Sequence, residues 1–123
     1  MFIKFYDHII NSDNIAQIGI DRYTGKGEGN SIYANTFLGE MILLADAEGR
    51  YSIGLMRYYL QKIFNAIQDD EDIDLDRLSR HPIPLPAEMR REGLSEWDIE
   101  TVMKYKEERE REAEEFSFGR GET

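Results

Sequence analysis

The N-terminal part of the chain alternates between apolar and polar residues, which is the pattern of half-buried β-strands. Residues 2–10 are rich in β-branched and aromatic side chains and predict one strand, with Ile3, Phe5 and Ile9 on a common face. A cluster of turn formers at residues 11–14 follows it. The pattern therefore predicts a β-meander that starts near the N-terminus.

Four further segments complete the predicted sheet, and turn formers separate them. They are residues 15–23 with a bulge at Gly19, residues 31–37, the unbroken apolar run 41–45 that favours burial on both faces, and residues 51–55. A glycine-rich loop spans residues 24–30, and Gly49 suits a tight turn with positive φ.

The period changes from two to that of an α-helix at residues 57–68. The apolar positions fall at i, i+3, i+4 and i+7, and they are Leu60, Ile63, Phe64 and Ile67. A helix with this face can cover a small sheet. The predicted fold class is therefore α+β, an antiparallel β-meander covered by one helix, with residues 1–68 as the core.

The C-terminal half has a different pattern. Residues 69–95 are acidic and carry Pro82, Pro84 and Pro86, which predicts an extended linker with a short helical turn before Gly93. Ser95 can accept a hydrogen bond from the Asp98 amide, and this cap predicts a helix over residues 96–116. Beyond Lys104 that helix is polar on every side, so we expect it to project into solvent or to lie on a partner. Residues 117–123 are expected to be a disordered tail.

Charge separates the two halves further. Residues 1–68 carry seven acids and six bases, whereas residues 69–123 carry eighteen acids and nine bases, for a total of −10. A field of this sign repels nucleic acids and anionic membranes and attracts basic proteins.

There is no cysteine, which excludes disulfides and thiolate metal sites. Without a signal-peptide core or a long apolar run, the expected location is cytoplasmic.

No motif predicts catalysis. The loop around Lys26 lacks the spacing of a phosphate-binding loop, and the following residue is Gly27 rather than Ser or Thr. The acidic run from Asp70 resembles a calcium loop, but Leu75 and His81 occupy the positions that require Gly and Glu. The sequence therefore predicts a protein that is not an enzyme and needs no cofactor or metal.

Two groups of residues are candidates for binding. The partner-binding candidates are Trp97, Glu107, Glu108, Glu110, Glu112, Glu114 and Glu115, which would meet a basic protein, with no direct nucleic acid or membrane contact. The second group, Arg22 and Arg57, would contact the anion if the protein instead binds or sequesters a small, nucleotide-like ligand. A self-assembling structural subunit, and hence a homo-oligomer, is a further alternative.

Two short segments carry a resemblance. Residues 10–15, Ile-Asn-Ser-Asp-Asn-Ile, and residues 51–54, Tyr-Ser-Ile-Gly, which lead into a helix, look like segments of small accessory proteins of phages and mobile elements in Gram-positive bacteria. The resemblance covers residues 2–68. It implies an accessory or anti-defence role, and some acidic members of such groups resemble DNA mimics of the anti-CRISPR type.

Overall fold

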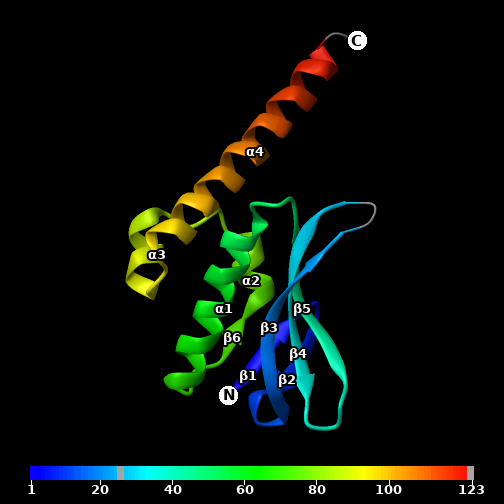
Figure 1. Ribbon diagram of the computed structural model, residues 1–123, viewed down its shortest axis with the longest axis vertical. Helices are drawn as coiled ribbons and strands as arrows, with labels where there is room; N and C mark the ends of the chain where they lie inside the picture. Colours follow the sequence, from blue (N-terminus) through cyan, green and yellow to red (C-terminus); the bar gives the residue numbers. More distant parts are fainter. Residues whose placement is uncertain (25–26, 122–123) are drawn as a thin grey trace.

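A three-stranded antiparallel sheet forms one layer of the molecule, and helices form the other (Figure 1). The computed structural model describes the backbone of residues 1–24 and 27–121, and side chains up to residue 115. The sheet contains β3 (Ile15–Tyr23), β4 (Gly29–Thr36) and β5 (Met41–Glu48) in that order. Helix α1 (Ser52–Gln68) packs across it, which confirms the predicted α+β class.

The predicted single strand over residues 2–10 is wrong, because the segment folds back on itself. Strand β1 (Phe2–Phe5) pairs with β2 (His8–Asn11) through a turn at Tyr6 and Asp7, whose φ angles are 43° and 63°. The Asp76 carboxylate accepts hydrogen bonds from the backbone N–H groups of Tyr6 (2.6 Å) and Asp7 (3.2 Å). These bonds offset the strain of positive φ at residues other than glycine. Because the strand reverses, Ile9 is exposed and does not share a face with the buried side chains of β1.

The predicted strand over residues 51–55 is also wrong, since α1 begins at Ser52. The Ser52 hydroxyl donates to the Gly49 carbonyl (2.5 Å) and accepts from the Asn30 side-chain amide (3.0 Å). Ser52 and Gly54 are buried while Tyr51 and Ile53 are only partly buried, so the small residues, not the apolar ones of the alternating pattern, face the core over residues 51–54. Gly49 has φ 94°, which confirms the predicted turn.

Two details of the main sheet differ from the prediction. Met41 and Leu43 in β5 are exposed, because the sheet is covered on one face only, and the run is not buried on both faces. The register shift in β3 lies between Ile15 and Gln17 rather than at Gly19. A Cβ on Gly19 would lie 2.8 Å from the Tyr33 hydroxyl, so the glycine makes room for that ring.

Residues 69–95 are not an extended linker throughout. They contain β6 (Ile73–Asp74), parallel to β1, and the helices α2 (Leu75–Arg80) and α3 (Pro86–Glu92). Helix α2 has an aspartate at its N-terminus: the Asp74 carboxylate accepts a hydrogen bond from the Arg77 backbone N–H (3.0 Å) and caps the helix. Leu75 and Met89 belong to the same buried cluster as Ile3, so this segment packs into the main core. Between α2 and α3, residues 81–85 form no helix or strand, and the backbone is extended at His81 and Leu85. The predicted turn ending at Gly93 (φ 99°) is confirmed.

Helix α4 (Glu96–Gly121) begins at the predicted cap, where the Asp98 backbone N–H donates to the Ser95 hydroxyl (3.2 Å). It continues to Gly121, past the predicted end at residue 116, so residues 117–121 are helical rather than a disordered tail. The last two residues of the predicted tail lie outside the described residues. In the part of the chain that was searched, no helix combines the length and the apolar composition that a membrane crossing needs.

Candidate functional site

The outer part of α4 leaves the body of the protein (Figure 1). The last residue of α4 that contacts the body among the described side chains is Arg109, and we call this contact the last tie. The Arg109 guanidinium donates to the Glu48 carbonyl (2.9 Å) and lies 5.0 Å from the Tyr105 ring centroid. Beyond Arg109, no described side chain of α4 forms a hydrogen bond or ion pair with another element. We call residues 106–115 the acidic outer half of α4.

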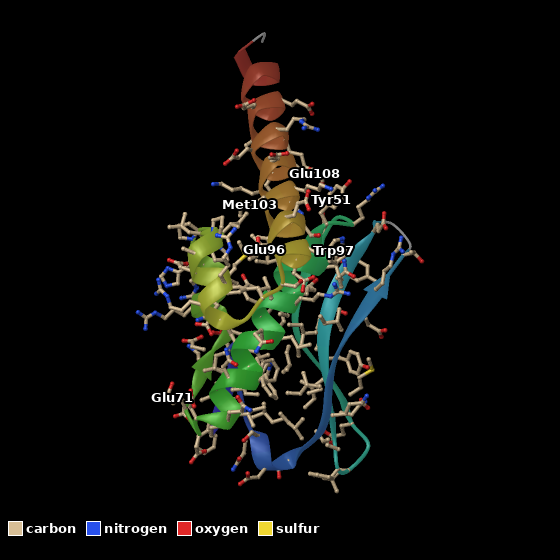
Figure 2. All side chains as sticks on the ribbon, turned by 60° about the vertical axis from the view of Figure 1, so that its left-hand side comes forward. Tyr51, Glu71, Glu96, Trp97, Met103 and Glu108 are labelled. Atoms are coloured by element: carbon tan, nitrogen blue, oxygen red, sulfur yellow. The ribbon has the colours of Figure 1, made fainter. Side chains whose placement is uncertain are left out.

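The structure places the six candidate glutamates on this outer half. Helical spacing sorts them into two neighbouring stripes, Glu107 with Glu110 and Glu114, and Glu108 with Glu112 and Glu115. Two of them pair within the helix: Lys106 with Glu110 at 4.0 Å and Arg109 with Glu112 at 3.3 Å. Trp97 does not join them, because it lies at the base of α4, about 15 Å along the axis from Glu107 (Figure 2).

Trp97 belongs instead to a second site, which we call the cationic cleft. It is a cavity of about 740 Å³ between the β3–β4 hairpin, the start of α1 and α4, and it brings together Trp97, Arg22 and Arg57 from three different elements. Among the described residues, the basic side chains that line it are Arg22, Arg50, Arg57 and Lys104. The described carboxylates that line it are those of Glu28 and Glu100, so this part of its wall is net positive in a protein of charge −10.

The two arginines predicted to hold an anion already have carboxylate partners. Arg22 pairs with Glu28. Arg57 pairs with Asp98 at 2.7 Å, and its guanidinium carbon lies 5.1 Å from the Trp97 ring centroid. Cation–π contact and ion pairing together fix Arg57 in place. Neither arginine therefore presents an uncompensated charge.

Sequence reasoning missed Arg50 and Lys104. No carboxylate of the described residues lies within 4.0 Å of either charge. Both cations lie against the Tyr51 ring, at 4.8 Å and 5.6 Å from its centroid. They are more than fifty residues apart in the chain, and no local pattern links them, so only the packing of α4 on α1 brings them to one ring.

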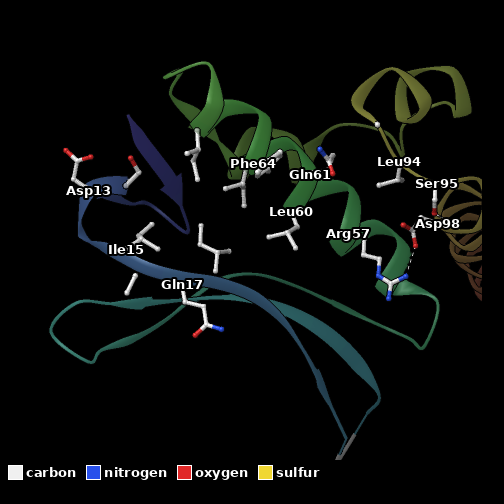
Figure 3. A pocket seen from close by; sticks show the side chains of 16 residues that line it. Asp13, Ile15, Gln17, Arg57, Leu60, Gln61, Phe64, Leu94, Ser95 and Asp98 are labelled. Carbon is white, nitrogen blue, oxygen red and sulfur yellow. Dashed lines mark hydrogen bonds and ion pairs between the residues drawn. The ribbon is translucent and has the colours of Figure 1, made fainter.

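An apolar groove of about 850 Å³ adjoins this cleft between β3 and α1 (Figure 3). Its apolar walls are formed by Ile15, Ile18, Leu60, Ile63, Phe64, Ile67 and Leu94. The face predicted for α1 is thus only partly covered: Ile63 is buried, whereas Phe64 and Ile67 remain about half exposed.

The acidic segment that resembles a calcium loop has structural contacts. Asp72 accepts from the Phe2 backbone N–H (2.8 Å), and Asp76 holds the β1–β2 turn. These backbone hydrogen bonds lower the pKa of the Asp76 carboxyl. The residues searched contain no cluster of three or more side chains able to hold a metal ion.

Two groups near α1, the buried Tyr59 and the partly buried Glu92, are also structural. Burial raises the pKa of the Tyr59 hydroxyl to about 12, so this group stays neutral at physiological pH. Glu92 joins α3 to α1 through Lys62 Nζ (3.0 Å) and the Asn65 side-chain amide (2.8 Å). Neither group faces the cationic cleft.

Comparison with protein-family models, with curated proteins and with solved structures yields no match to this chain. The resemblance to phage and mobile-element proteins stays a prediction.

Proposed function

We propose that the protein is a non-catalytic binding module whose acidic outer half of α4 engages a basic surface on another protein. The observation that supports this proposal is the helix itself, which continues past its last tie at Arg109 with exposed glutamates. A partner that handles nucleic acid, such as a defence protein, offers the complementary basic surface. This partner class agrees with the mobile-element inhibitor role that the resemblance implies.

The outer half places like charges next to one another along the helix. Like charges three or four residues apart on a helix repel by about 0.2–0.5 kcal/mol per pair. Glu110 with Glu114 and Glu108 with Glu112 are such pairs, and only two ion pairs compensate within the described helix. A basic partner converts this repulsion into attraction, speeds association and makes it sensitive to salt.

The test is capture of partners from a lysate of the native host with three proteins: the wild type, a helix variant and a body variant. In the helix variant all six glutamates of the outer half are changed to Gln. The body variant neutralises six exposed acids that form no ion pair or side-chain hydrogen bond in the described structure, namely Asp13, Asp21, Glu40, Asp69, Glu71 and Glu88.

Because both variants lose six negative charges, they separate a local site from the overall field. We expect the wild type and the body variant to retain the same basic protein at low salt and to release it at high salt, while the helix variant retains nothing. Equal retention by all three proteins, or equal loss by both variants, would contradict the proposal.

A further inference from the structure

The cationic cleft and the apolar groove are neighbouring cavities that share Arg57 in their walls, and we call the two together the trough. Strand β3 runs along both cavities: Ile15 and Ile18 line the groove, and Ile20 and Arg22 line the cleft. Arg57 lines both and stands between them. The trough is therefore apolar at one end and positively charged at the other.

Arg57 is held at the junction from two sides. Its partner Asp98 lines the groove (Figure 3). The ring on which Arg57 stacks, that of Trp97, lines the cleft. Asp98 is mostly buried, so this pair is fixed and marks the boundary between the two chemistries. A ligand that occupies the trough must pass Arg57 with its polar end toward the cleft.

From this arrangement we propose a second binding site, for a small anionic amphiphile with a carboxylate or phosphate headgroup on an apolar chain. Arg50 and Lys104 hold the headgroup, because their charges have no carboxylate partner within 4.0 Å among the described residues. The chain lies along α1 from Arg57 to Ile67, a distance of about 15 Å at the rise of an α-helix. This site is independent of the acidic outer half of α4.

Both ends of the trough favour an anionic amphiphile over an anion without an apolar chain. A protein of charge −10 repels anions unless a local cluster of cations reverses the field, and the cleft supplies that cluster. In the groove, Phe64 and Ile67 remain 52% and 43% exposed, although they belong to the helix face that covers the sheet. A bare anion leaves this apolar surface in water, whereas an alkyl chain buries it.

Trp97 provides a direct probe, because it is the only tryptophan and it lines the cleft. Its fluorescence is measured on the full chain during titration with dodecanoate and, separately, dodecyl phosphate, both below their micelle concentrations. Inorganic phosphate tests the headgroup alone, and dodecyltrimethylammonium tests the chain with the opposite charge. We expect saturable quenching by dodecanoate, by dodecyl phosphate or by both, which identifies the headgroup, and at least tenfold weaker binding of the two controls.

Matched variants test the two ends. Lys104→Gln and Arg50→Gln should each weaken binding about tenfold, as expected for loss of one charge-assisted hydrogen bond, while Arg91→Gln in α3 should not. Phe64→Ser should weaken binding, whereas Leu85→Ser, another exposed apolar position, should not. The inference fails if neither amphiphile binds or if phosphate binds as tightly as dodecyl phosphate. It also fails if the affinity for the amphiphile is unchanged in the Arg50, Lys104 and Phe64 variants. None of these results affects the proposal for α4, which the capture experiment tests.

Discussion

The two halves of α4 belong to one helix but are stabilised in different ways. In residues 96–105, Ile99 and Val102 are buried. This part of the helix packs so closely on α1 that only glycine fits at position 54. In the acidic outer half, every described contact beyond Arg109 is an ion pair within the helix itself. Exposed pairs of this kind contribute about 0.3–0.5 kcal/mol each.

This difference shows which part of the helix serves the fold and which part is available for binding. The inner half loses stability when its buried residues change, since these residues are part of the core. The outer half can change without affecting the core, so its composition is set by something other than folding. The predictions that follow test this division, beginning with the largest effect.

The largest effect is expected at the contact between α1 and α4. A Cβ at residue 54 would lie 2.8 Å from the Val102 backbone nitrogen and 3.0 Å from the Asp98 carbonyl oxygen, and backbone atoms cannot yield. Gly54→Leu should therefore lower the free energy of unfolding by about 3 kcal/mol or more in denaturant titrations. The control Ala113→Leu, on the outer half, should change it by less than about 0.5 kcal/mol. A small effect of Gly54→Leu would show that the inner half is not tightly packed.

A smaller effect is expected where α3 is tied to α1 at the base of α4. Glu92→Ala removes the acceptor for Lys62 and Asn65 and should cost about 1–3 kcal/mol at neutral pH. The exposed control Glu112→Ala should cost less than about 0.5 kcal/mol. Equal costs for the two variants would contradict the division of the molecule into a packed base and an outer helix.

The effect of Glu92→Ala should also depend on pH. Burial alone would raise the pKa of the Glu92 carboxyl, but hydrogen bonds from Asn65 and Lys62 outweigh it and lower the pKa. A depressed pKa contributes stability above the ordinary value of about 4.3 that is lost as pH falls through the folded-state pKa. The difference between wild type and Glu92→Ala, measured by denaturant unfolding, should therefore shrink in acid. A difference that stays constant from neutral pH to about pH 3 would show that packing, not the charge, holds this contact.

The smallest effect on stability is expected for removal of the part of the outer half that lies beyond Arg109. A chain ending at Arg109 keeps the tie to Glu48 and every buried side chain of α4. Its free energy of unfolding should stay within about 0.5 kcal/mol of the full chain, with a loss of helical circular dichroism that matches the residues removed. A loss of more than about 1 kcal/mol would mean that the outer half supports the fold.

Local signals predicted much of the fold. The Ser95 cap, the α1 face around Ile63 and the turn at Gly49 depend on neighbouring residues, and the structure has all three. The turn at Tyr6 and Asp7 could not be predicted, because it depends on Asp76, about seventy residues away. The first turn of α1 was misassigned because buried small residues have the same spacing as the polar positions of a strand.

The sites show the same limit. The six glutamates were predictable, since helical spacing alone places them on one exposed segment. The cationic cleft was not predictable beyond Arg22 and Arg57, because Arg50 and Lys104 meet only through Tyr51 and the packing of α4 on α1. The strongly acidic composition of the chain also gave no sign of a local cluster of positive charges.

We propose the acidic outer half of α4 as a binding surface for a basic partner. The most direct measurement is the affinity of the captured partner as a function of salt concentration for the wild type, the helix variant and the body variant. We predict a steep loss of affinity with salt for the wild type and the body variant, and weak, nearly salt-independent binding for the helix variant. The same salt dependence for the helix variant as for the wild type would contradict the claim.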